Sequence, residues 1–155
     1  MKTKTSKRAK ALLRPGSIPN RSRADQKWKL AIHMKWKGRC GICRRPGRDA
    51  HHIIGRDNMA TRHDLRNGML LCFTHHQGRS PLSVKHHPAA FTARVKLLYP
   101  GTYQWVMAQK CEPIKKPDYI AAAERLERYI SGELTEEQVN DLADNPLSEG
   151  VAHVD

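Results

Sequence analysis

The feature that most constrains this 155-residue chain is a pair of short motifs that each hold two metal-binding side chains. The first motif is CGIC, with Cys40 and Cys43, and the second is CFTH, with Cys72 and His75. A two-residue spacer lets both side chains of a motif face one ion, and thiolates with imidazole are typical ligands of structural Zn2+. We therefore predict that these four residues close one tetrahedral zinc site and make the intervening segment a rigid loop.

The remaining cysteine and the hydrophobic pattern indicate the compartment. Cys111 has no partner at metal spacing and is most simply a free thiol, so a reducing, cytoplasmic environment fits better than a disulfide framework. No apolar run has the length of a membrane span, and the basic N-terminus is not followed by an apolar signal core. We expect a soluble, unsecreted protein without a membrane partner.

Charge is strongly segregated along the chain. Residues 1–110 hold 24 Lys and Arg against 4 Asp and Glu, whereas residues 111–155 hold 4 against 11. The net charge of +13 therefore combines a basic part of +20 with an acidic part of −7. Phosphate backbones bind a basic surface by releasing counterions, so nucleic acid is the expected partner and an anionic membrane surface is the alternative.

Composition also divides the chain into three segments. Residues 1–23 are rich in Lys, Arg, Ser and Pro and are predicted to be a disordered basic arm, used for DNA contact or only as a solvated tail. Residues 24–110 hold the motifs and form the predicted folded domain. Residues 111–155 are predicted to be a helical acidic extension, in which Thr135 and Gln138 have capping-box spacing. This extension is a solvated helix, a partner-binding segment or a self-masking one.

Apolar spacing predicts helices over about 25–37, 88–98 and 119–130. In the first of them, Trp28 and Trp36 lie at helical spacing on one face. Aromatic residues in such a pattern pack in a core more often than they stack on bases. The basic residues between them are the better DNA contacts.

Two strands are predicted from apolar runs in the zinc-bracketed segment. The runs cover 50–54 and 69–73, and the first is bounded by glycines. Together they are expected to form a two-stranded ribbon. Thr74 is then predicted to cap a helix that starts near His75, which places His76 in the first turn facing the ribbon.

The polar residues within this frame resemble those of a known family. The segments read AHHIIGR, RHDLRNG, LLCFTHH and, downstream, HHPAAF. Their order and spacing resemble the HNH endonucleases, in particular the zinc-stapled members common in phage genomes, over residues 38–92. The resemblance implies an α+β fold with a small ββα-metal core, flanked here by helices and the basic arm. It also implies a phage or prophage origin, a bacterial host cytoplasm and partners in phage packaging or recombination.

The resemblance assigns a role to each of four residues. Neighbouring strand residues point to opposite faces, so the histidine pair splits. His51 joins His76 as a ligand of the catalytic metal, and His52 is the general base that takes a proton from water. Asn67 ties down the loop and so orients the base. Two imidazoles leave positions open for phosphate and water, and the ion is Mg2+, Mn2+, Ni2+ or Zn2+.

Further candidates follow from position alone. Arg56, Arg62 and Arg66 lie close to the motif, and a guanidinium binds phosphate through two parallel hydrogen bonds. The alternative is that they are ordinary surface arginines of a basic protein. His86 and His87 are candidates for a third catalytic ligand, although histidines beside a proline-initiated helix are more often solvent-facing.

These expectations lead to one function and its alternatives. We predict a DNA endonuclease that hydrolyses phosphodiester bonds with a His general base and one catalytic divalent metal. The alternative is a non-catalytic zinc-dependent nucleic-acid-binding protein, and an RNA-directed role is a weaker one. An exchange of roles between His75 and His76 also stays open, although the spacing from Cys72 favours His75 in the zinc site.

Overall fold

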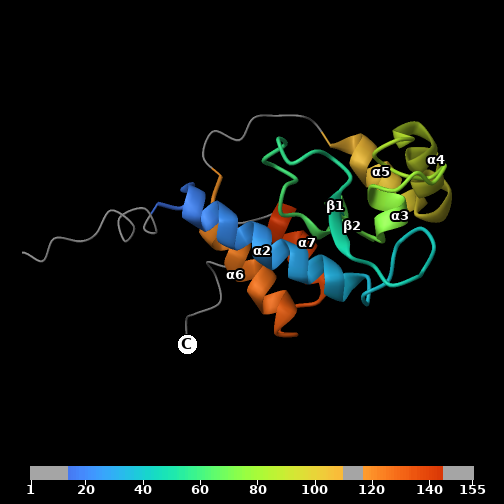
Figure 1. The fold of residues 1–155 in the computed structure, drawn as a ribbon. Helices are drawn as coiled ribbons and strands as arrows, with labels where there is room; N and C mark the ends of the chain where they lie inside the picture. The colour runs from blue at the N-terminus through green and yellow to red at the C-terminus, as the bar shows by residue number, and fades with distance from the viewer. Residues whose placement is uncertain (1–13, 110–116, 145–155) are drawn as a thin grey trace, which may run out of the picture.

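The computed structural model describes residues 14–109 and 117–144 and has an α+β architecture built around one antiparallel hairpin (Figure 1). The predicted arm over residues 1–13 and Cys111 lie outside the described residues. In chain order the elements are α2 (Ile18–Lys35), β1 (Asp49–His52), the 3-10 helix η1 (Leu65–Asn67), β2 (Gly68–Leu71), α3 (Phe73–His76), α4 (Pro88–Leu98), α5 (Pro100–Ala108), α6 (Tyr119–Ile130) and α7 (Glu136–Asp144).

The predicted ribbon is confirmed as an antiparallel pair of strands. Asp49 is opposite Leu71 and His52 is opposite Gly68. Both strands end two residues earlier than the apolar runs suggest, because Cys72 is already the N-cap of α3 and, after β1, the Ile54 N–H donates to the Asn67 side chain. Glycine is required at position 68, since a Cβ there would collide with the side chains of Ile32 and Trp28.

Alternating side chains of β2 divide the interior into two cores. Leu70 packs with residues of α2, η1, α6 and α7, whereas Met69 and Leu71 pack with α4 and the loop that precedes β1. Figure 1 accordingly shows the hairpin between α2, α6 and α7 on one side and α3 and α4 on the other. Trp28 is 1% exposed in the first core, and Trp36 packs against both, so their predicted core packing is confirmed.

The first helix begins earlier than predicted. Helix α2 starts at Ile18, so residues 18–23 belong to it and not to a disordered arm. The reason is long-range: Ala24 is fully buried against Tyr119 and Ala123 of α6, and α6 packs along α2. The local sequence of residues 18–23 gives no sign of this contact with α6.

Helices α4 and α6 have the predicted bounds, and the predicted capping box of α7 is present. The Thr135 N–H donates to Gln138 Oε1 (2.9 Å), and the Gln138 N–H donates to Thr135 Oγ1 (3.3 Å). Because α6 and α7 contribute Leu126 and Val139 to the same core as Trp28, these two helices of the acidic segment are part of the main packing unit.

The structure adds one helix that was not predicted and corrects one predicted cap. Pro100 starts the additional helix, α5. Helix α3 begins at Phe73 with Cys72 at its N-cap, so Thr74 is not the cap. The backbone explains this, because the Cys72 carbonyl already accepts the N–H groups of His75 and His76.

Within the described ranges, no helix is long and apolar enough to cross a membrane.

Candidate functional site

The four residues of the two cysteine and histidine motifs meet at one point. Their ligand atoms all lie within 4.8 Å of one another. His75 Nδ1 is 3.3 Å from Cys72 Sγ and 3.6 Å from Cys40 Sγ, and Cys43 Sγ is 3.8 Å from Cys72 Sγ. Tetrahedral Zn2+, with bonds of about 2.3 Å to sulfur and about 2.0 Å to nitrogen, places its ligand atoms roughly 3.5–3.8 Å apart. The predicted group therefore has the geometry and donor set of a structural zinc site.

Backbone contacts hold the loop of residues 36–48, which carries Cys40 and Cys43. We call this loop, together with Cys72 and His75, the zinc knuckle. Arg44 has a positive φ of 61°, which turns the loop back so that the Cys40 N–H donates to the Arg45 carbonyl (2.8 Å). The Gly41 N–H donates to Leu70 of β2 (2.8 Å) and so docks the knuckle on the hairpin. Burial raises the pKa of Cys40, but nearby backbone N–H groups outweigh it and lower the pKa, which favours the thiolate that zinc binds.

His75 and His76 point to different sites although they are neighbours in α3. His75 is buried in the zinc group, which decides the open exchange in favour of the predicted arrangement. His76 points the other way, and its Nδ1 lies 3.1 Å from Asp49 Oδ2. The sequence analysis missed Asp49. The available signal was its position two residues before His51 on the same strand, which places both on one face.

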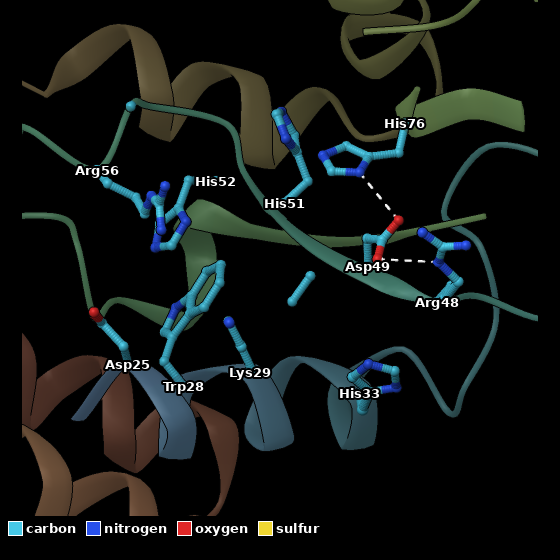
Figure 2. Close-up of a pocket in the computed structure, with 12 residues that line it drawn as sticks. Asp25, Trp28, Lys29, His33, Arg48, Asp49, His51, His52, Arg56 and His76 are labelled. Atoms are coloured by element: carbon cyan, nitrogen blue, oxygen red, sulfur yellow. Dashed lines mark hydrogen bonds and ion pairs between the residues drawn. The ribbon is translucent and has the colours of Figure 1, made fainter. Parts of the chain in front are cut away.

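His76 borders a cleft of about 590 Å³ between β1 and α2. Figure 2 shows Lys29 and His33 rising from α2 toward β1. Arg56 and Arg48 lie toward opposite ends of the set of labelled lining residues. The lining residues combine histidines, cations and two carboxylates: Asp25, Trp28, Lys29, His33, Arg48, Asp49, Ala50, His51, His52, Gly55, Arg56 and His76. All three histidines of the motif therefore lie in one basic cleft.

His52 is held in a single orientation. Its ring stacks on Trp28, with centroids 3.6 Å apart and planes 10° apart. Its Nε2 lies 2.8 Å from the Arg62 carbonyl, which can only accept, so Nε2 carries the proton and Nδ1 keeps a free lone pair. Burial lowers the pKa of His52 to about 4, helped by the charges of Arg62 and Arg56 and opposed by the bond to the carbonyl. The imidazole is neutral at physiological pH and can accept a proton.

His51 also lines the cleft, but its side chain points toward His76 of α3 and Phe91 of α4. Its ring centroid is 5.3 Å from that of His76 and 5.8 Å from that of Phe91. Burial first, and then the charges of His76 and His52, lower the pKa of His51 to about 4. Neutral imidazole is the form that binds metals. Among the described residues, however, only the zinc knuckle group brings three or more His, Cys, Asp or Glu ligand atoms together, so His51 and His76 form a two-residue pair.

Asn67 is fully buried and holds the loop that follows β1. Its Oδ1 accepts the Ile54 N–H (2.7 Å), while its Nδ2 donates to the carbonyls of Ile54 (3.1 Å) and Thr61 (3.0 Å). One side chain thus ties both ends of the 54–61 loop to the start of β2. The loop leads directly to Arg62, whose carbonyl orients His52.

Two of the three predicted phosphate-binding arginines are occupied within the fold. Arg62 is 8% exposed and donates to both oxygens of Asp25 (2.8 and 2.7 Å). Arg66 is paired with Asp64 and Asp144. A charged guanidinium that is removed from water needs an opposite charge beside it, and both side chains therefore pair with carboxylates. Of the three, Arg56 alone is exposed at the cleft.

Asp25 lines the cleft and stays ionised. Burial raises its pKa, but hydrogen bonds from Arg62 and His63, together with their charges, outweigh burial and lower the pKa to about 2. This carboxylate is therefore neutralised by Arg62, and the exposed cations on the rim dominate the cleft. His86 and His87, the candidate third ligands, are exposed and do not line the cleft.

No protein-family model matches this chain, and no curated protein and no solved structure matches it. A function is therefore inferred from the zinc knuckle, the cleft and the motif resemblance.

Proposed function

We propose that this protein is a metal-dependent DNA endonuclease whose β1, β2 and α3 form a ββα-metal core of the HNH type. The observation that carries the proposal is the meeting of His51, His52 and His76 in one basic cleft. The neutral, oriented His52 with a free Nδ1 supports it further. The zinc knuckle, in this proposal, only holds the hairpin in place.

Phosphodiester hydrolysis needs an activated water and stabilisation of the charge that builds on the phosphate. His52 Nδ1 accepts the proton of the attacking water, and its bond to the Arg62 carbonyl and its stack on Trp28 keep the ring aimed. His51 and His76 are the residues that would hold a divalent ion, Mg2+, Mn2+, Ni2+ or Zn2+. Such an ion, when bound, supplies Lewis-acid stabilisation of the phosphate and leaving oxygen. Asn67 keeps the loop behind His52 rigid.

The distribution of charge pairs supports DNA binding in the cleft. Lys29 and Arg56 are exposed there, and no ion pair involving either is found in the part of the chain that the structure describes. By contrast, acidic residues of α6 and α7 neutralise cations outside the cleft, in the pairs Lys27 with Glu127, Lys35 with Glu136 and Arg66 with Asp144. A phosphate backbone is therefore attracted to the side of the molecule that holds the histidines.

A second candidate is a non-catalytic zinc-dependent nucleic-acid-binding protein. The observation that favours it is that, within residues 14–109 and 117–144, the zinc knuckle holds the sole group of three or more metal-binding side chains at coordination distance. In that case the cleft would bind DNA without cutting it.

Cleavage of supercoiled plasmid with Mg2+, Mn2+, Ni2+ or EDTA separates the two candidates. The variants are His52→Ala, His52→Phe, which keeps an aromatic ring on Trp28 but has no proton acceptor, and His86→Ala as an exposed control outside the cleft. We expect both His52 variants to lose about 10²- to 10⁴-fold in cleavage rate while binding DNA and zinc normally. His86→Ala should cut like the wild type.

Two results would contradict the proposal. One is wild-type protein that is folded, binds DNA and contains zinc but cuts no plasmid with any of these ions, which would favour the binding protein. The other is undiminished metal-dependent cleavage by His52→Phe, which would exclude His52 as the base.

A further inference from the structure

Asp49 contacts a candidate metal ligand through a specific ring nitrogen. Its Oδ2 lies 3.1 Å from His76 Nδ1, and its Oδ1 lies 3.3 Å from Arg48 Nε. An ionised carboxylate only accepts hydrogen bonds, so the proton of a neutral His76 sits on Nδ1. The lone pair is then on Nε2, the nitrogen available to a metal.

The second ring nitrogen of His76 faces His51. Figure 2 shows one edge of the His76 ring toward Asp49 and the other toward His51. Asp49 and His51 are two residues apart on β1 and therefore share a face of the strand, with His76 reaching them from α3. The carboxylate and the imidazole partner thus lie on opposite edges of the same ring.

We propose that Asp49 is a positioning residue that fixes His76 in the Nδ1–H tautomer and so directs Nε2 toward His51. That Nε2 there binds the catalytic ion rests on the proposed function, whereas the tautomer does not. Asp49 is not itself a third ligand in this arrangement, because among the described residues its oxygens do not form a group with His51 and His76 at coordination distance.

The known chemistry of metal-binding histidines favours this arrangement, in which His76 binds the ion and Asp49 orients its ring. Histidines that bind metals commonly donate their second N–H to a carboxylate, which orients the ring and makes the ligand nitrogen more basic. A histidine side chain in water favours the Nε2–H tautomer, so a partner is needed to reverse the preference. Arg48 holds the second oxygen of Asp49, and its guanidinium lies over the Phe73 ring at 5.3 Å, which keeps the carboxylate in place.

The test is nitrogen NMR of the histidine rings in zinc-replete protein without added metal, followed by titration with Mn2+. The variants are Asp49→Leu, which keeps the branched shape but has no acceptor, and Asp49→Asn, whose amide oxygen still accepts an N–H. Asp57→Asn is the matched control, because it removes one exposed negative charge from the neighbouring loop outside the residues that line the cleft.

We expect the Nδ1–H tautomer at His76 in the wild type, in Asp49→Asn and in Asp57→Asn, and its loss in Asp49→Leu. Mn2+ affinity should fall about 10- to 100-fold in Asp49→Leu and less in Asp49→Asn. An unchanged His76 tautomer in folded Asp49→Leu would overturn the inference. A tautomer that depends on Asp49 in a protein that binds no Mn2+ would uphold the positioning role and exclude Mn2+ as the catalytic ion.

Discussion

The zinc knuckle and the cleft both use histidine, for different purposes, and they meet at two adjacent histidines. His75 joins three cysteines in a group whose ligand atoms lie within 4.8 Å, while His76 lines an open cleft of about 590 Å³. Successive residues of a helix are turned by about 100°, so one short helix serves both sites. Four close donors complete a tetrahedron and leave no room for substrate, whereas two histidines beside exposed cations leave open positions.

The two regions also differ in what holds them. The knuckle has its own backbone hydrogen bonds to β2, and its loop places Trp36 and Ile42 against the second core, but two of the loop's other side chains in that core are the ligands Cys40 and Cys43, so its closure depends on the zinc site. Most side chains of the cleft stand on α2 and β1, which pack in the first core, and His76 stands on α3. Loss of a knuckle ligand should therefore affect folding, and loss of a cleft residue should affect chemistry or binding.

The largest expected effect is the contrast between His75→Ala and His76→Ala. A structural zinc site contributes on the order of 10 kcal/mol to folding, so His75→Ala should lose zinc and lower the melting temperature strongly. His76→Ala should keep its zinc and its fold while losing Mn2+ binding and cleavage. Zinc content and thermal unfolding of the two purified variants measure the difference. Equal zinc content in both would break the division between knuckle and cleft.

A smaller effect is expected for Asn67→Ala, which removes the side chain that holds the wall of the cleft. The buried backbone groups of Ile54 and Thr61 lose their partners, so stability should fall by about 2–4 kcal/mol. The cleavage rate should fall more than Mn2+ affinity, because Asn67 supports His52 and touches neither metal ligand. Urea unfolding, cleavage rates and Mn2+ titration provide the three values.

Asn58→Ala is the control for that experiment. Its side chain accepts one local hydrogen bond, from the Ala60 N–H, and should cost about 1 kcal/mol. If Asn67→Ala were no more destabilising than Asn58→Ala, Asn67 would not be the anchor of the loop.

The smallest expected effect is on the salt dependence of DNA binding, which distinguishes cations in the cleft from cations outside it. Lys29 lines the cleft, whereas Lys27 is paired with Glu127 on α6. Lys29→Ala should reduce the slope of log K against log[salt] for a short DNA duplex by about 0.9, the value for one lost phosphate contact, and Lys27→Ala should leave it nearly unchanged. Fluorescence anisotropy over a salt series measures both slopes. Equal slopes would place the DNA elsewhere.

Local patterns predicted several parts of this molecule correctly. The spacing within CGIC and CFTH identified the zinc ligands, and periodicity with caps located α4 and α6. These predictions succeed because the zinc spacing, the helix periodicity and the caps all depend on residues that are close together in the sequence. The start of α2 was missed because its partner, α6, lies about a hundred residues away in the chain.

The arginines show the same limit at the site. Arg56, Arg62 and Arg66 are equivalent by sequence position, and only the fold reveals that two of them are paired with carboxylates. Asp49 was missed because its contact with His76 joins a strand to a helix.

The sequence by itself determined the donor set of the zinc knuckle, the α+β class and the segregation of charge, since each depends on residue type and short-range spacing. Only the tertiary structure decided which of two adjacent histidines enters the cleft, which cations remain exposed there, and which carboxylate contacts His76. Each of those outcomes depends on how separate elements pack, because a side chain's partners across the hairpin are set by long-range burial and not by its neighbours in the chain.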